Sequence, residues 1–159
     1  MYFCENFFMT PIWILIISTV CWIIYSIFEG KREAWFYHTY SKPVNLNKDI
    51  HFYFTVQRMS VCVPFILMNL SFEYWFITAA EIVLLTVLFL GIFVFFHDGF
   101  YYLERNNQNM LIYKLRFRDY NDSTAIFDFK WNERVIFFIG SILAFILLLI
   151  IKIYLYKLC

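Results

Sequence analysis

Residues 76–105 read FITAAEIVLLTVLFLGIFVFFHDGFYYLER, an apolar stretch that holds one carboxylate, Glu81, before His97, Asp98 and Gly99. The fifteen residues 82–96 carry no charge. With the residues on the other side of Glu81, this run is long enough to cross a bilayer as a helix, which takes about 20 residues. We therefore predict a membrane-spanning helix over 76–97 that ends in His97, Asp98 and Gly99 at one membrane surface.

The composition agrees with a membrane protein. The 159 residues are 62% hydrophobic, 24% aromatic and 16% charged, whereas soluble domains are about 45–50% apolar and about 25% charged. A domain with so few polar side chains cannot face water on all of its surface, so the chain is predicted to be an all-α integral membrane protein. Neither G-x-G-x-x-G nor a P-loop occurs in the sequence, and no nucleotide partner is expected.

Three further apolar runs predict membrane spans over 8–28, 50–70 and 135–155. The first run lacks a basic segment before it, so it is interpreted as a retained anchor rather than a secretory signal. The second contains Arg58, whose long side chain can reach back to a membrane surface, and Pro64, which predicts a kink. The sequence thus predicts one domain, 1–159, built as a four-transmembrane-helix bundle with inner loops over 30–48 and 105–133.

The longest polar segment, 106–134, lies between the third and fourth spans. Its alternation of apolar and basic residues favours a short interfacial hairpin, and a short helix that runs into the fourth span is an equal alternative. Basic and aromatic side chains together are typical of a membrane surface, so no nucleic-acid partner is expected. The residues predicted to contact lipid headgroups are Lys114, Arg116, Arg118, Lys130 and Trp131.

The distribution of basic residues predicts the orientation. Of the 13 Lys and Arg residues, all but Lys152 and Lys157 fall on one side of the four predicted spans. The positive-inside rule then places both termini on the outer side and both larger loops on the inner side. The membrane is expected to be a bacterial inner membrane or an organellar membrane.

Histidines and several carboxylates collect on the same inner side. Imidazole and carboxylate together suit Zn, Mn or Fe as a divalent ion, and helical bundles hold such ions with side chains from facing helices. The candidate metal ligands are Glu29, Glu33, His38, His51, His97 and Asp98. The competing interpretation is a set of ordinary interfacial ion pairs, in which Glu29 or Asp98 neutralises Arg58.

Glu81 lies sixteen residues before His97, about 24 Å along an ideal helix, and therefore in the outer half of the membrane. An intramembrane carboxylate is a functional candidate by default. It is interpreted as a packing or partner contact, as a hydrogen-bonded group beside Ser18, Thr19 or Thr78, or as part of a proton pathway.

Two classes of function follow from these patterns. The first is a non-catalytic four-pass membrane protein that acts through lipid and helix contacts, as an accessory or self-assembling subunit whose partners are other membrane helices. The alternative is a metal-dependent enzyme at the inner lipid interface. A pore or proton pathway through Glu81 is third.

Overall fold

The computed structural model describes residues 2–39, 47–72, 74–108, 117–118 and 129–158, with side chains described for most of them. Four α-helices account for nearly all of these residues: α1 (Tyr2–Thr39), α2 (Asn47–Met68), α3 (Trp75–Gln108) and α4 (Trp131–Leu158). Most of the 106–134 segment, where a hairpin or a short helix is predicted, lies outside the described residues.

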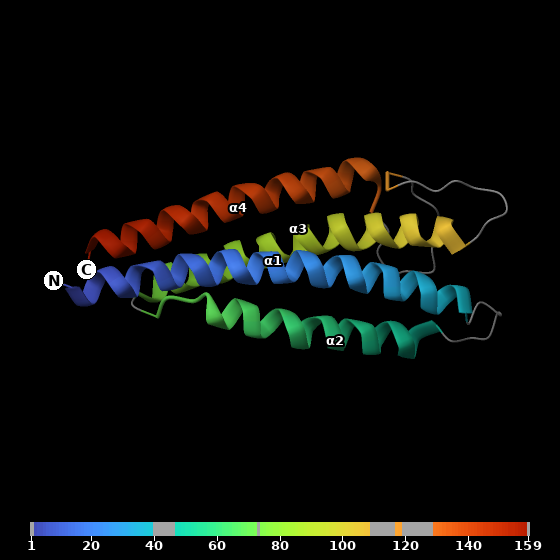
Figure 1. Cartoon of the computed structure of the whole chain (residues 1–159), viewed down its shortest axis with the longest axis horizontal. Coiled ribbons are helices and arrows are strands. Elements are labelled where there is room, and N and C mark those ends of the chain that lie inside the picture. Colours follow the sequence, from blue (N-terminus) through green and yellow to red (C-terminus); the bar gives the residue numbers. More distant parts are fainter. Residues whose placement is uncertain (1, 40–46, 73, 109–116, 119–128, 159) are drawn as a thin grey trace.

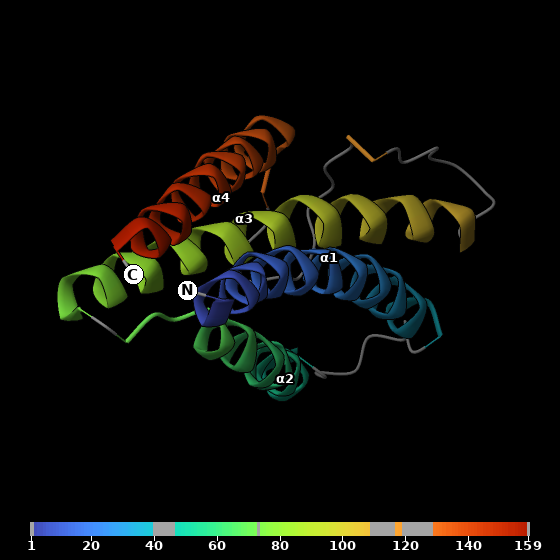
Figure 2. The same ribbon diagram turned by 60° about the vertical axis from the view of Figure 1, so that its left-hand side comes forward.

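The helices run alternately up and down (Figure 1). The start of α1 and the end of α4 lie at one end of the molecule, and the end of α1 and the start of α2 lie at the other. The long helix α3 packs extensively against α1 and against α4, whereas α2 makes few close approaches to any helix. In Figure 2, α4 lies on one side of the α1–α3 pair and α2 lies on the other.

Three of the helices are long and apolar enough to cross a membrane, over Pro11–Phe36, Trp75–Arg105 and Trp131–Leu155. The apolar part of α2, Tyr53–Met68, is shorter. The large apolar side chains that are exposed on the helices are suited to lipid, which solvates them as well as a protein interior does. The described part of the chain is therefore a helical bundle, and its three long apolar helices support a membrane location.

Two helices continue past the ends of their predicted spans. Helix α1 reaches Thr39, and α3 runs through His97, Asp98 and Gly99 to Gln108. The prediction that α3 ends at Gly99 is wrong, because the helix continues to Gln108. Gly99 lacks the positive φ that a helix-ending glycine often has. Its missing side chain instead leaves room for the ring of Phe117, which would overlap with a Cβ atom there.

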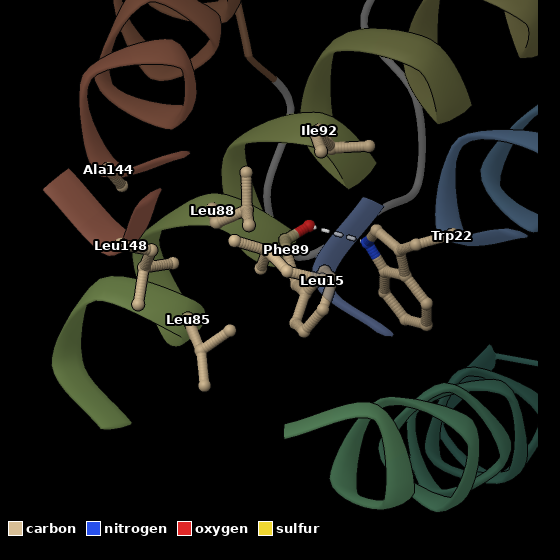
Figure 3. Close-up of a cluster of buried hydrophobic side chains, with 8 residues drawn as sticks. All are labelled: Leu15, Trp22, Leu85, Leu88, Phe89, Ile92, Ala144 and Leu148. Carbon is tan, nitrogen blue, oxygen red and sulfur yellow. Dashed lines mark hydrogen bonds between the residues drawn. The ribbon is translucent and has the colours of Figure 1, made fainter. Parts of the chain in front are cut away.

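The middle of the bundle is apolar. The core cluster consists of Leu15, Trp22, Leu85, Leu88, Phe89, Ile92, Ala144 and Leu148, which come from α1, α3 and α4 (Figure 3). The indole Nε1 of Trp22 donates a 2.7 Å hydrogen bond to the backbone oxygen of Phe89. This bond satisfies the one polar group that a buried tryptophan brings into an apolar core.

Two glycines allow the helices to approach closely. A Cβ atom at Gly30 of α1 would overlap with the backbone carbonyl of His97 on α3, and one at Gly91 of α3 would overlap with Ser141 and with the carbonyl of Phe137 on α4. Small residues at a crossing let backbones come together, which is how helices pack inside a membrane. The central helix α3 is therefore fixed to each of its two main neighbours by a glycine contact.

Candidate functional site: two buried polar clusters

Ion-paired side chains inside the bundle gather into two clusters. The first, called here the Arg58 cluster, consists of Glu29 and Glu33 of α1, Arg58 of α2, and His97 and Asp98 of α3. The second, called the Lys152 cluster, consists of Asn69 and Ser71 after α2, Glu81 of α3 and Lys152 of α4.

Arg58 lies among the carboxylates of its cluster. Its Nη2 atom is 2.5 Å from Glu33 Oε2, and its Nε atom is 3.7 Å from Glu29 Oε1. The guanidinium also lies over the ring of Phe93, 5.0 Å from its centroid. Glu29 and Glu33 are four residues apart on α1 and so lie on one face of that helix, which explains how both reach the same cation.

His97 is buried between two carboxylates. Its Nδ1 atom is 3.0 Å from Asp98 Oδ1, and its Nε2 atom is 2.7 Å from Glu33 Oε2. Its ring stacks on Phe93 with 4.5 Å between centroids. A polar partner at each nitrogen and a stacked ring on one face fix the orientation of the imidazole.

The edge of the Arg58 cluster is exposed. Arg32, whose side chain is 44% exposed, donates a 2.7 Å hydrogen bond to Glu29 and a 3.2 Å hydrogen bond to Gln57 of α2. Arg58 itself is 23% exposed. This cluster is therefore located where the bundle interior meets its surroundings.

The Lys152 cluster is more deeply buried. Lys152 Nζ is 2.6 Å from Glu81 Oε1, and their side chains are 5% and 0% exposed. Lys152 also donates to the backbone oxygen of Asn69 and to Ser71 Oγ, at 2.6 Å and 2.8 Å. The backbone N–H of Ser71 donates to the second Glu81 oxygen at 2.6 Å.

Asn69 connects this cluster to α1, because its Nδ2 atom donates a 2.9 Å hydrogen bond to Ser18 Oγ. The neighbours that the sequence suggested for Glu81 bond elsewhere: Ser18 and Thr19 donate to the carbonyl of Leu15, and Thr78 to that of Ser71. Helices α1, α3 and α4 and the turn between α2 and α3 thus contribute to one hydrogen-bonded group.

The structure brings four of the six candidate metal ligands, Glu29, Glu33, His97 and Asp98, into one cluster. The side chains of the other two, His38 and His51, lie outside those described. Among the described residues, no group of three or more His, Cys, Asp and Glu side chains is arranged to hold a metal ion. Glu33 faces the guanidinium of Arg58, and Glu29 lies between those of Arg32 and Arg58, at 2.7 Å and 3.7 Å.

The predicted headgroup contacts are placed in part. Lys130 and Arg118 are exposed, and the Arg118 guanidinium lies over the ring of Trp131, 5.6 Å from its centroid. Lys114 and Arg116 lie outside the described residues. Arg134, one of the cations predicted on the inner side, is fully buried, with its guanidinium 5.7 Å from the ring centroid of Tyr102.

Sequence reasoning identified Glu81 and Arg58 as intramembrane polar residues but missed Lys152 and Ser71 as partners of Glu81, and Asn69 as a partner of Lys152. A signal for Lys152 is present in the sequence: it is one of the two cations predicted on the outer side, the half of the membrane in which Glu81 is also predicted. The three-residue link 69–71 gives no comparable signal, because its contribution depends in part on backbone atoms.

Each cluster neutralises charges that would be costly to bury alone. Removing one partner of a buried ion pair leaves an uncompensated charge, which costs about 3–5 kcal/mol. The Arg58 cluster joins α1, α2 and α3, and the Lys152 cluster joins α1, α3, α4 and the turn after α2, so both hold helices in register.

Comparison with family models, with curated proteins and with solved structures finds no match for this chain. Function is therefore argued from the geometry.

Proposed function

We propose that this chain is a non-catalytic four-pass membrane subunit that acts through helix and lipid contacts, either in a larger complex or by self-assembly. The observation that carries the proposal is the internal pairing of the two polar clusters. Glu33, Arg58 and His97 bond to one another, as do Glu81 and Lys152. The surface that remains is largely apolar and suited to helices and lipid.

Four crossings are proposed because α2 runs the length that a span requires. Its 22 residues correspond to about 33 Å of helix, close to the hydrocarbon thickness of about 30 Å. Its lower hydropathy follows in part from Arg58, whose charge is paired within the bundle. Both termini are then on the outer side, as the distribution of Lys and Arg favours, in a bacterial inner membrane or an organellar membrane.

The exposed face of α4 supports lipid contact most clearly. Its exposed large side chains are almost all aliphatic: Ile136, Ile139, Ile142, Leu143, Ile146, Leu147, Ile150 and Ile153. Lipid-facing surfaces have this composition, whereas helix contacts in membranes favour small and polar residues. Partner helices are therefore expected on other faces of the bundle.

The test is the native size of the chain, extracted from its own membrane with a mild detergent and measured together with its metal content. A particle larger than one chain, without stoichiometric metal, is the expected result. A monomer would contradict the proposal, whether or not it holds a metal.

The second candidate, a metal-dependent enzyme, is favoured by one observation: Glu29, Glu33, His97 and Asp98 lie together in one cluster, of which Asp98 is partly exposed. Zn, Mn or Fe held there would act as a Lewis acid or activate a water molecule. A stoichiometric metal that is lost in His97→Ala, with helicity unchanged, would establish it. Metal-free wild-type protein would leave only the contact role.

A proton pathway through Glu81 has less support. The core side chains of α3 between the two clusters, such as Leu88, Phe89 and Ile92, are apolar. They offer no hydrogen-bonded relay in this part of the structure.

A further inference from the structure

Helix α2 is attached to the bundle differently from the other helices. It lies outside the α1–α3 pair (Figure 2) and approaches α1 and α3 closely at few points. In water, its apolar face would hold it in place. In a membrane that force is absent, because lipid tails are as apolar as the side chains that they replace. Polar contacts and close packing must therefore determine the position of α2 in the bundle.

The polar contacts of α2 are concentrated at two levels. At one, Arg58 bonds to Glu33 of α1 and lies 3.2 Å from His97 Nε2 of α3. The ring of Phe54 adds contacts there, 5.7 Å from the Phe36 ring and 5.0 Å from the Arg32 guanidinium. At the other level, the residues that follow α2 belong to the Lys152 cluster.

The two levels differ in burial. Glu81 and Lys152 are 0% and 5% exposed, and the turn between them is held through backbone atoms as well as side chains. Arg58 is 23% exposed, at the edge of the bundle. Water or another polar group can replace the partners of Arg58 much more easily than those of Lys152.

Between the two levels, α2 makes ring contacts of moderate strength. Phe65 meets Trp22 edge-on at 6.1 Å and Phe89 at 6.2 Å between centroids. Cys62 packs against the same core while remaining half-buried. Pro64 removes one backbone hydrogen bond from the helix in this region.

From these observations we propose that α2 is a hinged helix: it pivots on the Lys152 cluster, and breaking the contacts of Arg58 lets its first half swing away from the α1–α3 pair. The movement uncovers the side of α1 and α3 that carries Glu33, Phe93 and His97. A second membrane helix bearing a cation at the level of Arg58 is the kind of partner that this side would accept, because Glu29 and Glu33 would again be neutralised. The inference does not depend on the proposed function, since the movement belongs to the single chain.

Two distances between spin labels in lipid nanodiscs test the pivot. In a chain whose four cysteines (Cys4, Cys21, Cys62 and Cys159) are replaced by Ser, one label pair replaces Phe28 and Val56 near Arg58. The other replaces Trp13 and Leu67 near the Lys152 cluster. All four positions are exposed. In Arg58→Met, the 28–56 distances are expected to shift to longer values and the 13–67 distances to stay as in the wild type.

Arg105→Met is the matched control, because Arg105 contacts Tyr101 of its own helix, and it should change neither distance. Arg58→Lys, which keeps a positive charge, should restore part of the short 28–56 population. If Arg58→Met fails to fold, Glu33→Gln breaks the same contact and gives the same test. An unchanged 28–56 distance in the folded variant would overturn the inference, as would equal broadening of both pairs.

Discussion

The Arg58 cluster and the Lys152 cluster both join helices through ion pairs, but they differ in burial and in the atoms that they use. Arg58 reaches its partners with a long side chain from the edge of the bundle and remains 23% exposed. Lys152 bonds to a carboxylate that is 0% exposed and to the backbone of the turn after α2. The difference indicates that one end of α2 is fixed and the other is held more weakly.

The same difference determines how much each charge should contribute to stability. A buried pair that loses one partner costs about 3–5 kcal/mol, whereas an exposed pair contributes about 0–1 kcal/mol. The Lys152 pair is close to the first limit, and Arg58 lies between the two. Substitutions in the two clusters should therefore lower the free energy of unfolding by clearly different amounts.

The largest effect is expected for Lys152→Met. This change leaves Glu81 buried without its cation, and we expect a loss of about 3–5 kcal/mol in the free energy of unfolding. Denaturation by SDS in mixed micelles, followed by circular dichroism, measures it. The double variant Lys152→Met with Glu81→Gln removes both charges and should recover most of the loss. Equal losses in the single and double variants would show that charge pairing is not what the cluster contributes.

The next effect is expected at Gly30, which lets α1 approach α3 beside the Arg58 cluster. In Gly30→Ala the added methyl group overlaps with the His97 carbonyl, and we expect a loss of about 1–3 kcal/mol from overpacking. Gly140→Ala is the matched control: its Cβ would meet only Val87 Cγ1, at 3.9 Å. The same denaturation assay measures the free energy of unfolding of both variants. A Gly30→Ala variant as stable as Gly140→Ala would contradict the close helix contact.

The sequence was sufficient to predict the helices and the membrane class, because long uncharged runs can be stable only in lipid or in a large core. It also predicted that Glu29 or Asp98 would neutralise Arg58; Glu29 lies 3.7 Å from Arg58, but the closer partner, at 2.5 Å, is Glu33. Helix ends were predicted less well. Polar residues from 98 to 108 continue α3 past the apolar run, since helix propensity does not stop where hydropathy falls.

The pairing of Glu81 with Lys152 was not predicted, although both residues were placed in the same half of the membrane. The two are 71 positions apart in the sequence, and their contact depends on how α4 crosses α3. That crossing is set by the close approach at Gly91, where no Cβ separates α3 from Ser141. A span pattern gives the depth of a residue but not the direction in which its side chain points.

A smaller effect, and one that depends on salt, is expected for Arg58→Met. Because Arg58 is 23% exposed, we expect a loss of about 1–2 kcal/mol at low ionic strength, between the values for exposed and buried pairs. Salt screens accessible charges more than buried ones, so the loss should shrink in 1 M salt while that of Lys152→Met persists. Denaturation curves at both salt concentrations measure this, and a salt-independent loss would mean that the two clusters are equally buried.

The smallest effect is expected for Ser71→Ala, which isolates the backbone contribution to the Lys152 cluster. The hydroxyl of Ser71 donates to Glu81 at 3.0 Å and accepts from Lys152 at 2.8 Å, while its backbone N–H donates to Glu81 at 2.6 Å. Ser71→Ala removes only the hydroxyl, so we expect a loss of about 1 kcal/mol, the typical net value of a hydrogen bond. Ser60→Ala, on the exposed side of α2, is the control and should change stability less. A loss as large as that of Lys152→Met would show that the side chain of Ser71, and not its backbone, holds the turn to Glu81.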